Sequence, residues 1–241
     1  MRLLGNLATR IFDFVAALVA TFFFAIPWLI ITIAIKIQSP GPAFFNPTRV
    51  GKNGKTFTLY KFRSMRVDSG AIHATTLRGD SRIFPLGAFL RKTKLDETPQ
   101  LLNILKGEMS VIGPRPEDVD NATDMYKGKY AKILDVKPGL SSVASLYDYT
   151  HGEKYESEEL YNKEFLPKKL ALEVYYVEHR SFWYNLRLIV RTVKVIAQIA
   201  CGKESFEEPK ELKAALDNSA CHCKERSDEA IQEIEVSADG I

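Results

Sequence analysis

Cysteine is scarce in this chain of 241 residues, and its three cysteines do not form a disulfide framework. Cys201 stands alone, while Cys221 and Cys223 are too close together for an ordinary structural bridge, which favours a reducing compartment. The Cys-His-Cys run that they enclose lacks the second ligand cluster that a zinc site needs. A structural metal at this run is therefore not expected.

The familiar catalytic and nucleotide-binding motifs are also missing. The sequence has no Gly-x-x-x-x-Gly-Lys-Ser/Thr loop, no Gly-x-Gly-x-x-Gly after a strand, no paired-histidine zinc motif and no Gly-x-Ser-x-Gly elbow. His73, His151 and His179 are scattered singly, and we interpret each as a surface or packing histidine. These absences exclude the commonest kinases, dehydrogenases, zinc peptidases and serine hydrolases.

Charge is absent from the 22 residues Phe14–Ile35, which are enough to cross a bilayer as a helix. The run is too long for the apolar part of a signal peptide, so it should stay in the mature protein. Basic residues flank it on both sides, and both flanks therefore favour the cytoplasm. Pro27, near the centre, can kink a helix sharply. A re-entrant hairpin and a single kinked spanning helix both fit this pattern.

The remaining charge is unevenly distributed. Residues 1–201 hold 28 basic and 19 acidic side chains, a balance of +9, whereas residues 202–241 hold 5 basic and 11 acidic ones. A basic body suggests a polyanionic partner such as nucleic acid, anionic lipid or a phosphorylated small molecule. No nucleic-acid module is visible, so nucleic acid is not expected. The acidic tail, 202–241, is expected to be disordered.

Local patterns predict a mostly helical α+β protein. Asn53-Gly54 between two β-prone runs is a strong hairpin signal. Gly and Pro signals and helical periodicity place the other elements. We expect strands at Ala43–Val50 and Thr56–Phe62, a loop at Arg63–Pro85, and helices at Leu86–Leu95, Pro99–Gly107 and within Glu164–Ala200.

The last of these helical segments carries an apolar stripe. The positions recur at helical spacing with basic residues between them, a pattern typical of a helix that lies in the membrane interface. Packing on the protein core would explain the same stripe equally well. The stripe consists of Phe182, Trp183, Leu186, Ile189, Val193, Ile196 and Ala197.

Two adjacent carboxylates, Asp96 and Glu97, precede the helix that begins near Pro99. Helix capping is the simplest explanation for an acidic residue at such a place. Cations are frequent nearby, however, and two carboxylates among cations also suggest a site for Mg²⁺ and phosphate. A carboxylate can further act as a nucleophile and form an acyl phosphate. The surrounding cations are Lys61, Arg63, Arg91, Lys92, Lys94 and Arg115.

Several motifs together make the chain recognisable. The segments "RVGKNGKTFTLYKFRSMRVDS", "LRKTKLDETPQLLNILKGEMSVIGPRPE", "KPGL" and "EVYYVEHRSFWYNLRLIVRTVKVI" resemble, in this order, the bacterial sugar transferase family of monotopic polyprenyl-phosphate phosphoglycosyl transferases. The resemblance runs from about Arg10 to about Ala197. It implies a re-entrant membrane helix at 1–38 that breaks at Pro27, and a cytoplasmic catalytic domain at 39–201 with interfacial amphipathic helices.

The resemblance also implies a reaction and a set of partners. Family members move a sugar 1-phosphate from a UDP-sugar to undecaprenyl phosphate at the bacterial inner membrane, on its cytoplasmic side, and release UMP. Asp96 would be the nucleophile, and Glu97 would help to hold Mg²⁺ or to position substrates. Arg91 and Arg115 would grip phosphates, with Lys61 a further candidate. The partners are thus a UDP-sugar, undecaprenyl phosphate and inner membrane lipids, and a homodimer is left open.

The sequence departs from the family pattern at two places. Ile26-Pro27 stands where relatives often have Ser-Pro, and Ser141–Leu146 replaces a common Thr-Gly-Trp-Ala-Gln sequence after the "KPGL" turn. Two other functions use the same residues. One is a membrane-associated phosphatase or pyrophosphatase that transfers to water, and the other is a non-catalytic scaffold whose acidic tail recruits partners.

Overall fold

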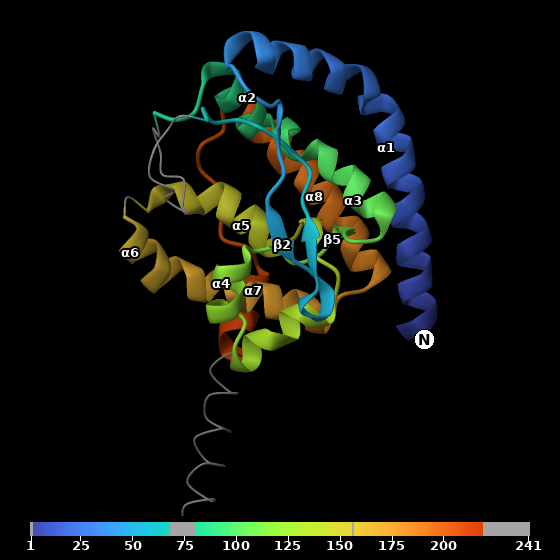
Figure 1. Ribbon diagram of the computed structural model, residues 1–241. Coiled ribbons are helices and arrows are strands. Elements are labelled where there is room, and N and C mark those ends of the chain that lie inside the picture. The colour runs from blue at the N-terminus through green and yellow to red at the C-terminus, as the bar shows by residue number, and fades with distance from the viewer. Residues whose placement is uncertain (1, 68–80, 156, 219–241) are drawn as a thin grey trace, which may run out of the picture.

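A long N-terminal helix curves around a domain of shorter helices and strands (Figure 1). The structure is a computed structural model, and it describes residues 2–67, 81–155 and 157–218. Helical segments of the described chain are α1 (Arg2–Gln38), η1 (Lys52–Gly54), α2 (Pro85–Thr93), η2 (Leu95–Gln100), α3 (Leu101–Lys106), α4 (Val119–Met125), η3 (Gly128–Asp135), α5 (Val143–His151), η4 (Gly152–Lys154), α6 (Glu158–Leu160), η5 (Tyr161–Phe165), α7 (Leu166–His179) and α8 (Phe182–Ala200). Strands are β1 (Phe44–Phe45), β2 (Thr48–Val50), β3 (Thr56–Thr58), β4 (Lys61–Phe62), β5 (Ser110–Ile112) and β6 (Gly139–Ser141).

The helix α1 is continuous through Pro27. Its stretch Leu7–Gln38 has a mean hydropathy of 2.5 and is long and apolar enough to cross a membrane. Large apolar side chains on its outer side are exposed, among them Phe22 at 80% and Ile26 at 72%. Figure 1 shows the helix bending along its length, with the domain on the inner side of the bend. The expected break into a helical hairpin is not seen.

The N-terminal half of α1 is bonded to the domain by two charged side chains. Arg10 donates from Nη1 to the carbonyl oxygen of Ile104 at 2.9 Å. Asp13 is buried, and its carboxylate accepts from the Ser110 hydroxyl and, at 3.2 Å, from the backbone N–H of Val111. These bonds fix the first half of α1 against α3 and β5.

The C-terminal end of α1 is bonded to the same domain. The buried guanidinium of Arg63 donates to the Ser39 carbonyl at 2.6 Å, to the Ser39 hydroxyl at 2.9 Å and to the Pro42 carbonyl at 2.5 Å. Gln38 accepts from the backbone N–H of Leu86 at 2.7 Å. Arg63 therefore satisfies carbonyl groups at the end of the helix, and it does not join the carboxylate site with which the sequence grouped it.

The predicted β-hairpin is confirmed. Strands β2 and β3 pair antiparallel around Asn53 and Gly54, both of which have positive φ. Asn and Gly tolerate this conformation, which explains the strength of the sequence signal. A second antiparallel pair, β1 with β4, extends the hairpin and places Lys61 opposite Phe45. Residues 68–80 of the expected loop Arg63–Pro85 lie outside the described residues.

One strand pair was not predicted. Strands β5 and β6 are parallel, with Ser110 opposite Gly139 and Ile112 opposite Ser141. The backbones approach so closely beyond β5 that a Cβ atom on Gly139 would lie 2.0 Å from the backbone nitrogen of Gly113. Glycine is therefore required in the "KPGL" turn for steric reasons.

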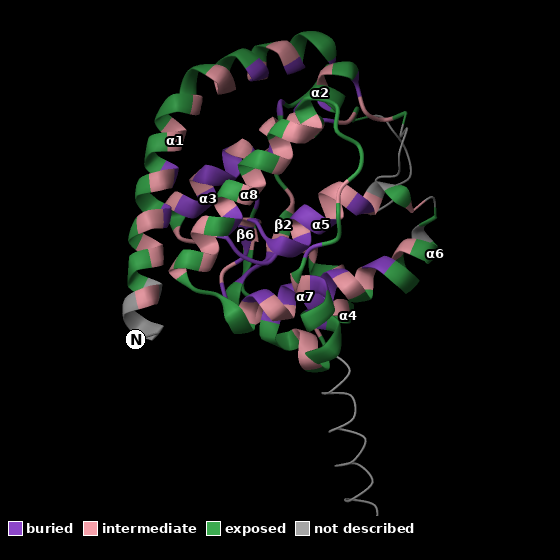
Figure 2. Ribbon diagram, turned by 180° about the vertical axis from the view of Figure 1, so that it is seen from behind, coloured by how far each residue is buried: buried purple, intermediate pink, exposed green. Residues whose placement is uncertain are grey.

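The main core lies between α5, α7, α8 and β5. Figure 2 shows the buried residues gathered inside the domain and along the inner sides of its helices. The apolar stripe of α8 is divided, because Ile189 packs against the main core whereas Trp183 and Val193 are 69% and 64% exposed.

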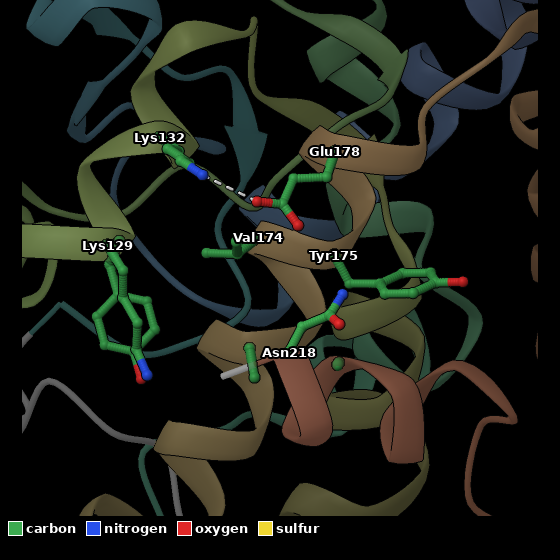
Figure 3. A pocket seen from close by; sticks show the side chains of 9 residues that line it. Lys129, Lys132, Val174, Tyr175, Glu178 and Asn218 are labelled. Atoms are coloured by element: carbon green, nitrogen blue, oxygen red, sulfur yellow. Dashed lines mark hydrogen bonds and ion pairs between the residues drawn. The ribbon is translucent and has the colours of Figure 1, made fainter. Parts of the chain in front are cut away.

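The start of the acidic tail is ordered, contrary to the expectation of disorder from residue 202. Residues 211–218 are helical, and Leu212 and Ala215 are buried in the main core. Glu211 accepts a bidentate ion pair from Arg191 of α8, at 3.1 and 3.2 Å. A surface pocket forms where this helix meets α7 and η3, and Lys132 and Glu178 pair at its edge (Figure 3). Residues 219–241, with Cys221 and Cys223, lie outside the described residues.

Burial of the tail helix can be tested by a truncated side chain. Leu212→Ala should reduce the free energy of unfolding by about 2–5 kcal/mol, the usual effect of emptying a buried leucine site. Leu216→Ala is the matched control, because Leu216 is in the same helix but 37% exposed, and it should change stability by less than about 1 kcal/mol. Thermal unfolding in detergent would measure both, and equal effects would contradict a packed tail.

Candidate active site

The two carboxylates lie in η2, a short 3-10 segment between α2 and α3. The chain turns sharply into η2 because Lys94 adopts a left-handed conformation with φ 57° and ψ 17°. The cap positions of η2 and α3 are occupied by Lys94 and Gln100, and no side-chain capping bond is made at either. Capping therefore does not explain Asp96 and Glu97.

Asp96 is almost fully buried, with 1% of its surface exposed. Its Oδ2 atom lies 2.9 Å from Nζ of Lys61, which makes a close ion pair. Its Oδ1 atom is buried and has no hydrogen-bond partner among the residues that the structure describes. A buried carboxylate oxygen without a partner is costly. The Oδ1 atom of Asp96 is therefore suited to interact with a bound ligand.

Glu97 lies within ion-pair distance of three cations. Its Oε1 atom is 3.6 Å from Arg115, 3.7 Å from Lys94 and 3.8 Å from Lys61. Burial acts to raise the pKa of Glu97, but Lys94, Arg115 and Lys61 outweigh burial, so this pKa is lowered well below its usual value. Burial lowers the pKa of Lys94, whereas Glu97 raises the pKa of Arg115. The site thus holds the ionised carboxylate of Glu97 amid an excess of positive charge.

The cations come from separate parts of the fold. Lys61 is in β4, beside the fully buried Phe62. Arg115 lies between two prolines in the turn after β5, and its carbonyl accepts from the Tyr126 hydroxyl at 3.3 Å. Its backbone N–H donates to Oε1 of Glu173 at 3.0 Å. The position of Arg115 beside Glu97 therefore depends on contacts with α7 and with the residue after α4.

Glu173 is a buried carboxylate that sequence reasoning missed. Besides the N–H of Arg115, it accepts from the Ser142 hydroxyl at 3.1 Å, and its Oε2 atom is buried without a partner in the described chain. Burial raises the pKa of Glu173 to about 7. The signal available in the sequence was one acidic residue within the apolar helical run "LALEVYYV", which cannot by itself reveal the partners.

A second buried ion cluster supports the same region and was also missed. Lys169 of α7 lies 3.4 Å from Glu117 and 3.3 Å from Asp148. The Tyr161 hydroxyl donates to Asp148 at 3.0 Å. These bonds join α7 to α5 and to the segment that follows Arg115.

The residues predicted for the site are not all in contact. Asp96, Glu97, Lys61 and Arg115 are brought together, as shown above. The side chain of Arg91, in the last turn of α2, makes no hydrogen bond or ion pair within the described residues, although its charge contributes to the lowered pKa of Glu97.

Pro27 lies in α1, outside the carboxylate site. The next residue, Trp28, donates from its indole nitrogen to the Thr98 hydroxyl at 2.9 Å. Because Thr98 follows Glu97 directly, the centre of the membrane helix is bonded to the turn that carries the carboxylates.

The donor set fits one small hard cation. Mg²⁺ is commonly held by one or two carboxylates together with substrate phosphates, and the adjacent buried carboxylates of Asp96 and Glu97 are ligands of this kind. Among the described residues, no group of three or more His, Cys, Asp or Glu side chains could form a metal site by itself. A cation here would therefore need the substrate to complete its coordination. The pocket in Figure 3 contains none of these residues.

The apolar helix α1 suits membrane association and the cations around the carboxylates suit phosphate groups, and comparison with known proteins gives the family. The family described as bacterial sugar transferase matches residues 4–199. The chain belongs to this family, as the resemblance implied.

Individual relatives agree with the family. A Caulobacter vibrioides protein is 36% identical over 196 residues, which are 80% of this chain and 70% of the relative. An Escherichia coli protein is 33% identical over 171 residues, which are 68% of this chain and 34% of the relative. Both are named UDP-glucose:undecaprenyl-phosphate glucose-1-phosphate transferase. The chain thus spans about a third of the Escherichia coli protein.

A relative with another donor is similarly close. An Aeromonas hydrophila protein, 34% identical over 76% of this chain and 42% of the relative, is named UDP-N-acetylgalactosamine-undecaprenyl-phosphate N-acetylgalactosaminephosphotransferase. Relatives of nearly equal identity therefore carry names with different sugars.

The raised pKa of Glu173 predicts a pH-dependent stability. Because the folded-state value of about 7 exceeds the ordinary value of 4.5, the stabilisation is complete below pH 4.5 and is lost as the pH rises toward 7. A shift of this size corresponds to on the order of 3 kcal/mol. Glu173→Gln should remove this part of the pH dependence, as measured by thermal unfolding from pH 4 to 8. Glu178→Gln, on an exposed part of α7, should leave it, and a wild-type profile retained by Glu173→Gln would contradict the assignment.

Proposed function

We propose that this protein transfers a sugar 1-phosphate from a UDP-sugar to undecaprenyl phosphate, giving undecaprenyl-diphosphate-sugar and UMP. The observation that carries the proposal is the buried Asp96, which has one oxygen paired with Lys61 and the other without a partner in the described chain. The family and the names of its relatives supply the donor and acceptor classes.

The geometry suits a two-step reaction with Asp96 as nucleophile. In the first step, its unpartnered oxygen forms a bond to the phosphorus attached to the sugar, the bond to the UMP oxygen breaks, and UMP leaves with that electron pair. In the second step, an oxygen of the lipid phosphate attacks the same phosphorus and the Asp96 carboxylate is released. The contact with Lys61 holds the Asp96 side chain in place for both steps.

The neighbouring cations bind the charge that moves in these steps. Arg115 presents a guanidinium beside Glu97, and Arg91 has donors that no group of the described chain uses. Both suit phosphate oxygens, which accept forked hydrogen bonds. Glu97, with Asp96, would hold Mg²⁺. When bound, Mg²⁺ would neutralise phosphate charge so that a carboxylate can approach.

Burial of the carboxylates argues against the alternative of hydrolysis. Asp96 is 1% exposed and Glu97 7% exposed, so water has little access to a phosphoryl group held there. A phosphatase needs a water molecule positioned at the phosphorus, whereas a transferase gains from its exclusion. The scaffold alternative does not explain why an unpartnered carboxylate oxygen is buried beside cations.

The contacts of α1 support the proposal that this helix is re-entrant. Arg10 and Asp13 near its start and Ser39 after its end are bonded to the same domain. A straight helix of 37 residues would be about 55 Å long, so a domain on one side of the membrane could not reach both ends. A helix that enters and leaves by the cytoplasmic face satisfies both sets of bonds, with Pro27 in its middle.

The same arrangement suits a protein that lies on the cytoplasmic side of the bacterial inner membrane. Basic residues flank both ends of α1, which favours the cytoplasm for each. The exposed Trp183, Arg187 and Lys194 of α8 combine an aromatic side chain with basic ones, as interfacial helices do. A UDP-sugar made in the cytoplasm and a lipid phosphate in the bilayer would then meet at η2.

The role of Asp96 predicts a large loss of activity. Asp96→Asn, which keeps the shape of the side chain but removes the nucleophilic charge, should reduce UMP release by at least about a thousandfold. The measurement is UMP release from a panel of UDP-sugars with Mg²⁺ and undecaprenyl phosphate, together with the amount of lipid-linked sugar formed. Asp124→Asn is the control, because Asp124 has an 83% exposed side chain that pairs only with Lys127 among the described ion pairs.

Three outcomes would contradict the proposal. Normal UMP release by Asp96→Asn would show that Asp96 is not the nucleophile. Free sugar phosphate in place of lipid-linked sugar would indicate the phosphatase. If folded protein in membranes releases no UMP from any of the UDP-sugars, the proposed transferase activity is wrong.

The topology of α1 gives a further prediction. A protease-sensitive tag before Met1 should be cleaved in inside-out vesicles and protected in sealed spheroplasts, because a re-entrant helix keeps this end in the cytoplasm. A second tag in the exposed hairpin turn at Gly54 should behave identically and serves as the cytoplasmic reference. If the tag before Met1 is cleaved only in spheroplasts, the helix spans the membrane and the re-entrant proposal is wrong.

A further inference from the structure

Lys94 is a cation of the site to which the family resemblance assigns no role. Its Nζ atom lies 3.7 Å from Oε1 of Glu97, which is an ion-pair distance but too long for a hydrogen bond. The side chain is 30% exposed, whereas that of Glu97 is 9% exposed. The ammonium group therefore lies at the open edge of the site, between the carboxylates and solvent.

The ammonium group of Lys94 has N–H donors that form no hydrogen bond within the described chain. Within the described chain it makes no hydrogen bond, and its contacts are the ion pair with Glu97 and the face of an aromatic ring. An ammonium carries three N–H donors, and desolvated ones need acceptors. Phosphate oxygens of a substrate that enters beside Glu97 would supply such acceptors.

The backbone of Lys94 points to the same conclusion. Its left-handed conformation is uncommon for residues other than Gly, Asn and Asp. The turn alone would favour one of those residues, so a lysine here is not explained by local structure. Strain of this kind is common at ligand sites.

The ring that holds the ammonium lies three residues after Ser141–Leu146, where the sequence departs from the family pattern. Nζ of Lys94 lies 4.3 Å from the centre of the Tyr149 ring, and the Tyr149 hydroxyl donates to the carbonyl oxygen of Lys92. Tyr149 is in α5, which packs on α7 and α8. The segment that follows the "KPGL" turn thus forms one wall of the site through Tyr149.

The two sides of the carboxylate turn differ in what they face. On one side Trp28 of the membrane helix is bonded to Thr98, and on the other Lys94 meets Tyr149 of α5. The membrane helix packs chiefly on α3, with further contacts to α2, α8 and β5. A lipid phosphate would approach along α1, which leaves the α5 side for the water-soluble donor.

We propose that Lys94, held by the ring of Tyr149, binds a phosphate group of the nucleotide diphosphate donor and so helps to select the donor. The proposal rests on the proposed function, because it takes the donor to be a UDP-sugar. It assigns to Lys94 binding of the donor, and not of the lipid phosphate. It also gives α5, which contains the end of the divergent segment and Tyr149, a role in donor recognition.

The test measures binding of UDP to the full-length protein in nanodiscs by calorimetry. Lys94→Asn removes the ammonium but suits the left-handed backbone, so the turn should be preserved. It should weaken UDP binding about tenfold or more, the size of one charge-assisted hydrogen bond. Lys127→Gln removes the same charge at an exposed position paired with Asp124, and it should change the affinity for UDP by less than about twofold, since distant exposed charges are screened.

Steady-state kinetics separate the donor from the lipid. The expected result is a raised KM for the UDP-sugar with an unchanged KM for undecaprenyl phosphate, and Tyr149→Leu should show the same pattern more weakly. Unchanged UDP affinity in Lys94→Asn, or a raised KM for the lipid alone, would overturn the proposal. If the melting temperature of Lys94→Asn falls, Lys94→Gly repeats the test with the backbone relaxed. Wild-type protein that neither binds UDP nor releases UMP would instead refute the proposed function.

Discussion

Two adjacent carboxylates cannot be buried together as anions unless cations are brought to them, and this requirement organises the domain. Lys61, Lys94 and Arg115 lie within ion-pair distance of Asp96 or Glu97. They come from a β-hairpin, from the end of α2 and from the turn after β5, respectively. Removing one partner of a buried ion pair leaves the other uncompensated. The relative positions of these three segments are therefore fixed by one small group of charges.

Other buried polar contacts hold those segments in place. Glu173 binds the backbone of Arg115, so that the α7 helix determines where the guanidinium lies. Arg63 bonds the end of α1 to the strand that carries Lys61, two residues earlier in the chain. Trp28 bonds the middle of α1 to Thr98. The helix α1 is thus connected to the carboxylate turn through Trp28 and to the strand of Lys61 through Arg63. A change in the bend of α1 would therefore shift the residues of the site.

The sequence alone was sufficient for much of the local structure. The Asn53-Gly54 hairpin and the helices at Leu86 and Pro99 were predicted because turn chemistry and periodicity act over a few residues. The parallel pair β5–β6 and the partners of Glu173 were missed because they join residues far apart in the sequence. The tail was misjudged for a related reason, since Leu212 and Ala215 are few apolar residues in a polar stretch, and composition gives no sign that they fill a core.

A transfer by way of one carboxylate needs two substrates of opposite character to reach the same oxygen in turn. One is soluble and the other lies in a membrane, so the site must be reached from two directions while water is excluded from the centre. Burial of Asp96 beneath Lys61 fits the exclusion of water. The membrane helix on one side and the partly exposed Lys94 and Tyr149 on the other fit the two directions. On this view the lipid side is constrained by α1, which every acceptor must approach, whereas the α5 side is free to vary among relatives that use different sugars.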